Sequence, residues 1–368
     1  MGELIWRYFL LVGLGWLSGF GLWAEAPRET AGHGQARDLG TVLMAEDRGA
    51  MATFSPQAET IERMVGFALT NFTHHTSLRD AWLSLVRTQD IVGIKVHSAP
   101  GATSGTRSSV VAGLIQGLIS AGVPAQQIIV WDRRLADLKR AGFMDLVARF
   151  GVQVLGSAEA GYDGTQFYEA PLLGQLVWGD HEFGQRGEGV GRKSFVSTLV
   201  STKMTKIIVV TPLLNHNQTG VMGAIASLAL GSVDNLHRFD LDPPRLATAV
   251  PELYALPSVG DKVVLNVMDA LLCQYQGEER SLLHYTVPLN QLWLSRDPLA
   301  LDTLALNELD RQRQAAEAPS SRPILDIYQN AELLDLGISD VRRMKIERVT
   351  WGEVAGGRRT AQGTDRVP

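Results

Sequence analysis

The sequence of 368 residues predicts an α/β fold: a doubly wound, mostly parallel sheet with helices on both faces and a loop-rich insertion. Short β-branched and aliphatic runs alternate with amphipathic stretches of helical period, most clearly over residues 90–155. Strands joined by such long crossovers run parallel, and the crossovers are right-handed. A glycine-rich stretch without a period, residues 156–192, predicts the insertion.

The individual elements follow from hydrophobic period. Residues 60–69 and 77–86 carry apolar side chains at helical spacing and predict two packing helices. Residues 91–96 are β-branched and predict a strand, followed by a helix over residues 110–119 that Gly122 ends. Further strands are predicted at residues 128–131, 152–155, 205–210, 263–268, 289–294 and 344–349, and further helices at residues 135–150, 220–230, 300–315 and 324–334.

Composition excludes several classes of function. The chain is 45% hydrophobic and 20% charged, which is typical of a globular protein. Its formal net charge is −5 and it has no basic block, so we expect no nucleic-acid partner. Cys273 is the single cysteine, which excludes an internal disulfide, a cysteine-ligated zinc site and an iron–sulfur cluster.

The first 26 residues predict a signal peptide. Arg7 precedes an uncharged run over residues 8–23, which ends in Ala24-Glu25-Ala26, a small-x-small pattern typical of signal-peptidase sites. We therefore expect an exported protein, periplasmic or extracellular, without membrane contact after cleavage. The alternative is an uncleaved N-terminal helix that anchors the protein, because the run approaches the ~20 residues that span a bilayer.

The remaining boundaries follow from period and composition. Residues 27–52 combine glycines with scattered charges and predict an irregular N-terminal arm. Residues 53–350 carry the strand and helix signals and predict one α/β domain. Residues 351–368 predict a flexible tail.

Polar residues follow five of the predicted strands. In an open α/β sheet, ligands bind beyond the carboxyl ends of the strands, so parallel neighbours would bring these residues into one cleft. The candidates are Lys95, His97, Asp132, Arg133, Asn215, His216, Asp269 and Asp297. These residues predict a cleft that binds a small anionic molecule.

Each residue type suggests a role in that cleft. The cations Lys95 and Arg133 would hold the anion, and Asp132 and Asn215 would line the same site. His97 and His216 are the acid–base candidates, because imidazole titrates near neutrality. Asp269 and Asp297 would ligate a hard divalent cation or orient a histidine.

The loop over residues 100–107 is a second candidate for anion binding. Its glycines, with Thr106 and Arg107 before a predicted helix, could cradle an anion with backbone N–H groups. The loop lacks the Gly-Lys-Ser/Thr of a P-loop and the G-x-G-x-x-G of a dinucleotide fold, so nucleotide binding is unsupported. The sequence has no G-x-S-x-G elbow either, so a serine hydrolase is unsupported.

An ordered series of motifs over roughly residues 60–350 resembles the domain of unknown function 362 family. The series comprises Val92-Gly93-Ile94-Lys95-Val96-His97, Ile128-Ile129-Val130-Trp131-Asp132-Arg133, Leu265-Asn266-Val267-Met268-Asp269-Ala270 and Ser295-Arg296-Asp297-Pro298. The resemblance implies an uncharacterised α/β domain. In some relatives this domain is exported, and in some it is attached to ferredoxin-like cysteine clusters. This chain has no cysteines for such a cluster.

The chain departs from the family pattern at several positions. Lys95 matches the family's strand-end lysine, but His97 stands where the pattern has asparagine. Leu213 and Leu214 stand where the pattern has lysines, and Ala226-Ser227 replaces a lysine–asparagine pair. Losing those cations implies a changed or lost anion chemistry.

Two functions therefore remain open. The first is an exported protein whose cleft binds a small anionic molecule, with or without a divalent cation, and catalyses a reaction on it. The second is a non-catalytic ligand-binding or interaction module of the cell envelope, which the substituted lysines favour.

Overall fold

The computed structural model describes residues 39–169, 192–240, 242–319 and 323–352, all within one compact unit, Arg37–Pro368. The predicted signal peptide, residues 27–38 of the predicted arm and nearly all of the predicted tail lie outside the described residues. Among the residues described, no helix combines the length and apolar character needed to cross a membrane.

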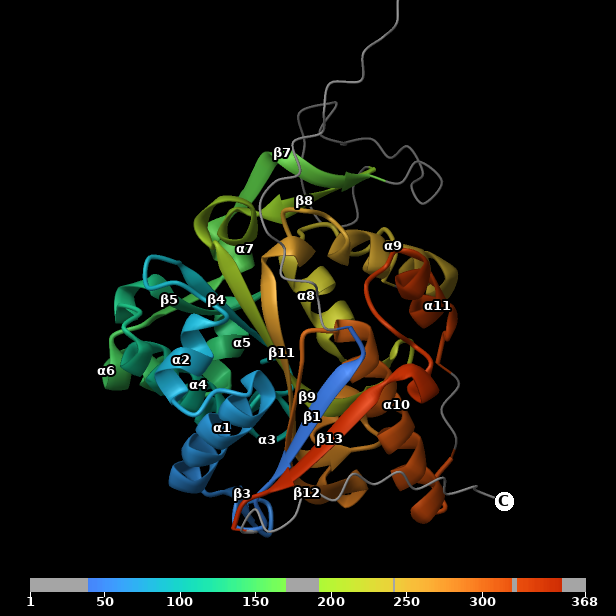
Figure 1. Cartoon of the computed structure of the whole chain (residues 1–368). Helices are drawn as coiled ribbons and strands as arrows, with labels where there is room; N and C mark the ends of the chain where they lie inside the picture. Colours follow the sequence, from blue (N-terminus) through green and yellow to red (C-terminus); the bar gives the residue numbers. More distant parts are fainter. Residues whose placement is uncertain (1–38, 170–191, 241, 320–322, 353–368) are drawn as a thin grey trace, which may run out of the picture. The chain divides into compact units, whose positions relative to one another are not determined.

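One mixed sheet organises the described part of the chain (Figure 1). Its strands are β1 (Thr41–Glu46), β4 (Val92–Val96), β5 (Ile128–Asp132), β6 (Gln153–Gly156), β9 (Lys206–His216), β10 (Gly220–Val221), β11 (Val263–Gln274), β12 (Thr286–Ser295) and β13 (Lys345–Thr350). Their order is β13-β1-β12-β11-β9-β4-β5-β6, with β10 paired to β9. Strands β11, β9, β4, β5 and β6 run parallel. The predicted α/β class is confirmed.

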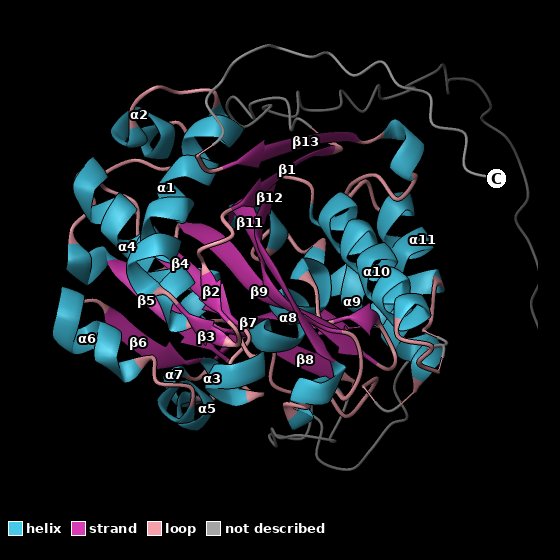
Figure 2. Cartoon of the chain, turned by 90° about the horizontal axis from the view of Figure 1, so that it is seen from below, coloured by secondary structure: helices cyan, strands magenta, loops and turns pink. Residues whose placement is uncertain are grey.

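Helices cover both faces of the sheet, as Figure 2 shows. The first face carries α1 (Ala58–Thr73), α2 (Leu78–Leu83), α4 (Ser108–Ala121), α5 (Leu135–Arg140) and α6 (Met144–Phe150); the second carries α8 (Ala224–Ser232), α9 (Pro243–Tyr254), α10 (Pro298–Ala315) and α11 (Asp326–Leu333). Alternate residues of β4 and β5 face opposite layers, so Ile94 packs in the first core and Trp131 in the second.

Capping residues define where several helices begin and end. Gly122 follows α4 in the left-handed conformation, at φ 103°, and the next amide, Val123 N, bonds back to Leu118 O. Asp242 and Asp297 cap the N-termini of α9 and α10 with side-chain oxygens, and a proline follows each.

Smaller elements fill the connections. The predicted insertion contains α7 (Ser157–Ala160) and a two-stranded antiparallel sheet of β7 (Tyr162–Glu169) and β8 (Lys193–Ser197); residues 170–191 lie outside the described residues. The remaining elements are β2 (Met51–Ala52), β3 (Ser55–Pro56), α3 (Gly101–Ser104), a π-helical turn (Leu199–Lys203) and 3-10 turns at Ala125–Gln127, Gly260–Lys262, Glu278–Arg280, Leu283–Tyr285 and Val341–Arg343.

The predicted irregular arm is wrong for its last part. Residues Thr41–Glu46 form β1, which pairs with β12 in antiparallel and with β13 in parallel orientation. The run Thr41-Val42-Leu43-Met44-Ala45 is almost wholly apolar, and its side chains pack against helices on one face and against α10 on the other. The α/β unit therefore begins before residue 53.

The predicted convergence of five strand ends is also wrong, because β12 is antiparallel to β11. The connection between these strands, residues 275–285, holds only short 3-10 turns and no crossover helix. Without a crossover the chain reverses direction. The carboxyl end of β12, and with it Asp297, therefore lies beside the amino ends of the parallel strands.

The order of the strands places a switch point between β4 and β9. The chain runs outward from β4 to β5 and β6, then returns to pair β9 with the other side of β4 and continues to β11. The helices that connect β4, β5 and β6 cover the first face, and the helices between β9 and β11 cover the second. Loops leaving β4 and β9 therefore diverge, which opens a crevice at their carboxyl ends.

Candidate active site

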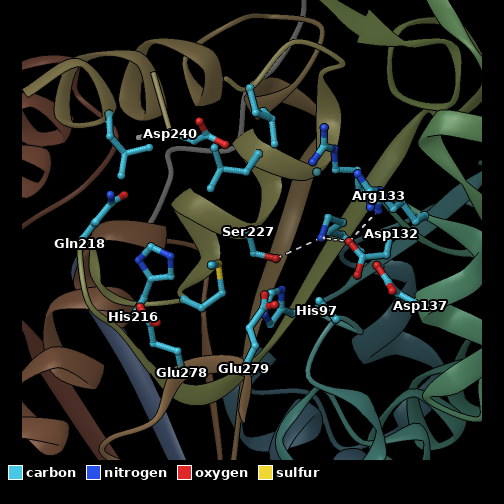
Figure 3. A pocket seen from close by; sticks show the side chains of 18 of the residues that line it. His97, Asp132, Arg133, Asp137, His216, Gln218, Ser227, Asp240, Glu278 and Glu279 are labelled. Carbon is cyan, nitrogen blue, oxygen red and sulfur yellow. Dashed lines mark hydrogen bonds and ion pairs between the residues drawn. The ribbon is translucent and has the colours of Figure 1, made fainter. Parts of the chain in front are cut away.

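A cleft of about 610 Å³ occupies this switch point (Figure 3). It lies over α8 and is bordered by residues that follow β4, β5, β9 and β11. Its polar lining consists of Lys95, His97, Asp132, Arg133, Arg134, Asp137, His216, Asn217, Gln218, Ser227, Asp240, Glu278 and Glu279. The structure thus brings together five sequence candidates: Lys95, His97, Asp132, Arg133 and His216.

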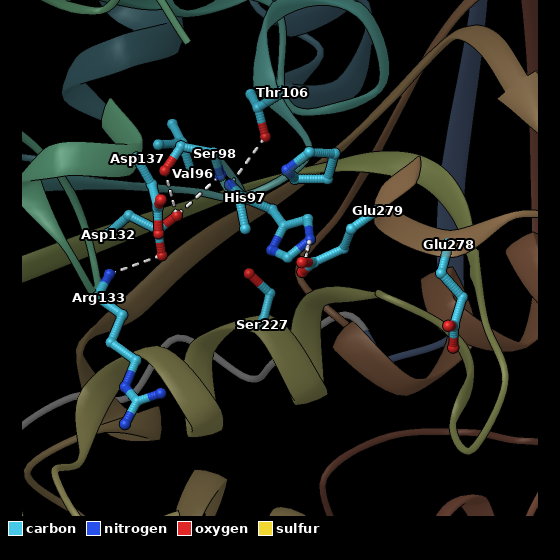
Figure 4. A network of polar contacts seen from close by, with 12 residues as sticks. Val96, His97, Ser98, Thr106, Asp132, Arg133, Asp137, Ser227, Glu278 and Glu279 are labelled. Carbon is cyan, nitrogen blue, oxygen red and sulfur yellow. Dashed lines mark hydrogen bonds and ion pairs between the residues drawn. The ribbon is translucent and has the colours of Figure 1, made fainter. Parts of the chain in front are cut away.

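Lys95 and Asp132 form a buried ion pair at the floor of the cleft. Figure 4 shows Asp132 with two further partners, Ser98 and Arg133. Lys95 is 1% exposed, and Nζ donates to Val96 O at 2.7 Å, to Asp132 Oδ1 at 2.8 Å and to Ser227 Oγ at 3.1 Å. An ammonium group has three protons, and the protein accepts all three. Lys95 is therefore a structural cation rather than a direct contact for a ligand.

The environment of Asp132 keeps its carboxyl group ionised. Burial raises the pKa of Asp132, but the positive charge of Lys95, with His97 and hydrogen bonds from Lys95 and Ser98, lowers it overall. Ser98 donates from both N, at 2.7 Å, and Oγ, at 2.6 Å, to Asp132 Oδ2. Lys95 Nζ donates a hydrogen bond to Ser227 Oγ, which is not the arrangement of a base that activates a nucleophile.

His97 follows β4 and is held by the backbone around Thr106. Its N donates to Thr106 Oγ1 at 3.0 Å, and its carbonyl accepts from Thr106 N at 2.9 Å. The side chain is only 9% exposed, and Nε2 lies 3.4 Å from Glu279 Oε1. His97 lowers the pKa of Glu279 through this contact, against the effect of burial. Glu279 therefore stays ionised and orients the imidazole.

His216 ends β9 with its tautomer defined by the backbone. Nδ1 accepts a hydrogen bond from Thr219 N at 3.1 Å, so in the neutral ring the proton is on Nε2. Burial lowers the pKa of His216 and the neighbouring His97 lowers it further, while the negative charges of Glu278 and Glu279 act in the opposite direction. The neutral ring therefore offers one N–H donor near pH 7.

Both glutamates lie on a short segment, residues 277–281, which we name the cleft-edge loop. Gly277, Glu278 and Ser281 have φ angles of 99°, 50° and 54°. Non-glycine residues rarely adopt such angles, and the surroundings must hold them. Here Asn215 Oδ1 accepts from Glu278 N at 3.0 Å, and Asn217 N donates to Glu278 Oε1 at 2.7 Å. Asn215 thus positions the loop from behind rather than lining the cleft.

Thr106 and Arg107 also lie behind the cleft. Thr106 Oγ1 donates to Val210 O at 2.8 Å and so joins β4 to β9. Arg107 forms a buried ion pair with Asp269, with Nη1 2.9 Å from Oδ1, and Arg107 N donates to Asp269 Oδ2 at 3.0 Å. The loop that was expected to bind an anion therefore directs its polar groups into the protein.

Asp269 and Asp297, the predicted metal ligands, are not brought together. Asp269 pairs in register with Leu292, and Asp297 lies five residues further along the chain, on the order of 15 Å away at the rise of a strand. Asp297 instead accepts from Gly40 N, Ala300 N and Ile338 N at 2.8–3.0 Å. In the described ranges no three His, Cys, Asp or Glu side chains form a group that could hold a metal ion.

Sequence reasoning missed the other polar residues of the lining, among them Ser227, Asp240, Glu278 and Glu279. A signal existed for the glutamates, since Gly277 follows a long apolar run and predicts a turn at a strand end. Ser227 lies in a helix of small residues and Asp240 in an irregular connection, so nothing local distinguished them.

Comparisons with known proteins match the chain to a family model and to a solved structure. A family model described as Domain of unknown function (DUF362) matches residues 92–307, a range that contains every residue of the cleft lining. A crystal structure of a Thermotoga maritima protein, from the Northeast Structural Genomics Consortium, is similar with a TM-score of 0.42 and 11% identity over 73% of this chain. This chain spans 61% of that protein. Among curated proteins, none matches.

Proposed function

The chain belongs to the family Domain of unknown function (DUF362), and we propose that its cleft is an active site that binds a small anionic molecule and moves a proton on it. One observation carries the proposal: His97 and His216 line the same cleft, and a different ring nitrogen of each lies beside a polar partner. One ring is oriented by a carboxylate and the other by a backbone amide. An acid and a base in one cavity are the minimum for proton transfer.

The two imidazoles take different roles because different nitrogens are engaged. Nε2 of His97 lies 3.4 Å from Glu279 Oε1, so Nδ1 of that ring is the nitrogen left to act as the base. The backbone of Thr219 occupies Nδ1 of His216, which leaves Nε2–H as the donor. His97 is therefore the proton acceptor, and His216 donates a hydrogen bond or a proton to the developing charge.

Arg133 and Arg134 supply the positive charge for an anion. Both line the cleft where the chain leaves β5. Arg133 N donates to Asp132 Oδ1 at 2.7 Å and its Nη2 donates to Asp234 O at 3.2 Å, which places the guanidinium along the wall. A guanidinium binds carboxylate or phosphate oxygens through planar pairs of N–H groups.

Deuterium exchange tests the catalytic step. The full chain is incubated in D2O with small carboxylates that carry an acidic C–H beside a carbonyl group, and exchange into that position is followed by NMR. Wild type should exchange at least one compound, and His97→Gln should lose exchange by about 100-fold or more. His97→Gln with undiminished exchange would refute the assigned base.

Calorimetric titration tests the anion contact separately. Arg133→Gln should weaken binding of the same carboxylate by about tenfold or more, as expected for a lost charged hydrogen bond. Arg79→Gln, at an exposed position on α2, is the matched control and should bind like wild type. Equal affinity of wild type and Arg133→Gln would remove the anion assignment.

A non-catalytic binding module is the second candidate, and the state of Lys95 favours it. That ammonium group is fully engaged by the protein, so the cleft has one cation fewer for a substrate than its residues suggest. Binding of a carboxylate without deuterium exchange in wild type would support this candidate.

We further propose that the protein acts outside the cytoplasm. The uncharged run over residues 8–23 and the small residues at Ala24 and Ala26 support export. N-terminal sequencing of the protein from fractionated cells tests this: a chain beginning at Pro27 supports cleavage, and one that retains residues 1–26 supports an anchor.

A further inference from the structure

We propose that the molecule bound in this cleft is zwitterionic, with a protonated amine at the end opposite its anionic group and Asp240 as the residue that binds the amine. This inference rests on the proposed function and adds a substrate class to it: amino acids or related amino-carboxylates.

The charges of the lining point to a ligand with a positive group. Apart from the Lys95–Asp132 pair, the described lining holds four carboxylates and two guanidinium groups. The carboxylates are Asp137, Asp240, Glu278 and Glu279. A purely anionic ligand would place like charges together in a partly enclosed space, which is unfavourable. An amine on the ligand replaces that repulsion with an attraction.

Asp240 is the carboxylate whose hydrogen bonding is incomplete. Its Oδ1 is buried and accepts no hydrogen bond from the described residues, while Oδ2 lies 3.3 Å from His237 Nδ1. The other three carboxylates are engaged by Arg140, Asn217 and His97. A buried acceptor without a donor costs about 1–3 kcal/mol. The Asp240 side chain is 26% exposed, so an ammonium group in the cleft would pair with its carboxylate, and a rotation of that carboxylate toward the ligand would give Oδ1 a donor.

The positions of the groups fit a ligand with charged ends and an apolar middle. In Figure 3, Asp240 and Arg133 come from different walls, and Ser227 of α8 lies between the Arg133 side and His216. Leu230, Leu236 and Leu246 contribute apolar surface to the same cleft. A carbon chain between the amine and the anion would lie against these leucines.

Two probes of equal length test the proposal on the full chain by calorimetric titration. 5-Aminopentanoate is a zwitterion, and glutarate carries a second carboxylate where the first probe has its amine. Wild type should prefer 5-aminopentanoate by about tenfold, the value of one charged hydrogen bond. Equal affinity, or a preference for glutarate, would overturn the inference and leave the anion site intact.

Two variants assign the preference to a residue. Asp240→Asn keeps the shape of the side chain and should remove the preference for 5-aminopentanoate while glutarate binds at least as well, which also shows that the variant is folded. Asp145→Asn, at an exposed position on α6, is the control and should keep the preference. A preference that survives Asp240→Asn would contradict the assigned contact. Absence of binding of either probe to wild type would refute the anion site, and this inference with it.

Discussion

Nζ of Lys95 lies 2.8 Å from Oδ1 of Asp132, and the two side chains stand at the carboxyl ends of neighbouring parallel strands. The pair joins β4 to β5, and Ser227 adds a contact from α8. Three elements that border the cleft therefore meet at one ammonium group. The pair sets the positions of His97 and Arg133, which follow these residues in the chain.

We expect Lys95→Met to destabilise the protein by about 3–5 kcal/mol, because Asp132 would remain buried without its partner. The double variant Lys95→Met with Asp132→Leu should recover much of this loss, since it removes both charges. Urea denaturation of the two variants and wild type measures the difference. A single variant as stable as wild type would show that the pair is not needed for the fold.

Gly231→Ala should destabilise the protein although alanine favours helices. A Cβ at this position of α8 would lie 2.2 Å from Lys95 Cε, so the buried Lys95 side chain and its hydrogen bonds would have to shift, and overpacking costs about 1–3 kcal/mol. Gly66→Ala in α1 is the matched control, because its Cβ would meet Leu78 at 3.6 Å, an ordinary contact. Thermal unfolding should show a lower midpoint for Gly231→Ala and an unchanged or higher one for Gly66→Ala.

Asn215→Ala should loosen the cleft-edge loop. Its Oδ1 accepts from Glu278 N, and without that bond a residue at φ 50° loses one of the contacts that hold it. We expect faster hydrogen exchange at the amides of residues 277–281 and a loss of about 1–3 kcal/mol in stability. Exchange in α4, on the far side of the sheet, should not change. Equal protection of the loop in variant and wild type would show that Asn217 alone holds it.

Asp302 predicts a pH dependence of stability. It comes from α10, is 3% exposed, and accepts from Ala224 N and Ile225 N at the start of α8. Burial raises its pKa to about 7 despite these two hydrogen bonds. The unfolded value is about 3.9, so between these values the folded state holds a proton that the unfolded state has released.

The stability contributed by this protonation is therefore complete below about pH 4 and is lost as the pH rises through about 7. At about 1.4 kcal/mol per pKa unit the change is a few kcal/mol. Asp302→Asn should flatten the dependence of the unfolding free energy over this interval, measured by urea denaturation at several pH values. A parallel dependence in variant and wild type would place the titrating group elsewhere.

The five parallel strands could be predicted because each is a short run rich in β-branched or other aliphatic residues that is followed by a helix or a long connection. The direction of β12 could not be predicted from its own residues, because the apolar pattern of Leu289–Leu294 suits a parallel and an antiparallel strand equally. The signal was the absence of a helix between residues 268 and 289. The prediction missed β1 because its six residues follow a glycine-rich stretch and are too few to show a clear strand period.

The cleft was predictable as a region rather than as a set of residues. A polar residue near a strand end can line the cleft, as His97 and His216 do, or hydrogen-bond the backbone of a neighbouring strand, as Thr106 does. Sequence does not distinguish these cases, because both need a short polar side chain after an apolar run. Asp240 became a candidate only through its place across the cleft and its unused oxygen.

The pairing of β1 determines when the sheet can be completed during synthesis. Thr41 O accepts from Ser295 Oγ, a partner 254 positions later in the chain. At 5–20 residues per second a ribosome needs roughly 10–50 s to reach it, and the codons for β13 come later still. Until then β1 is an apolar nascent segment without hydrogen-bonding partners, open to chaperones and to aggregation. The first strand of the sheet to leave the ribosome is therefore among the last to be incorporated.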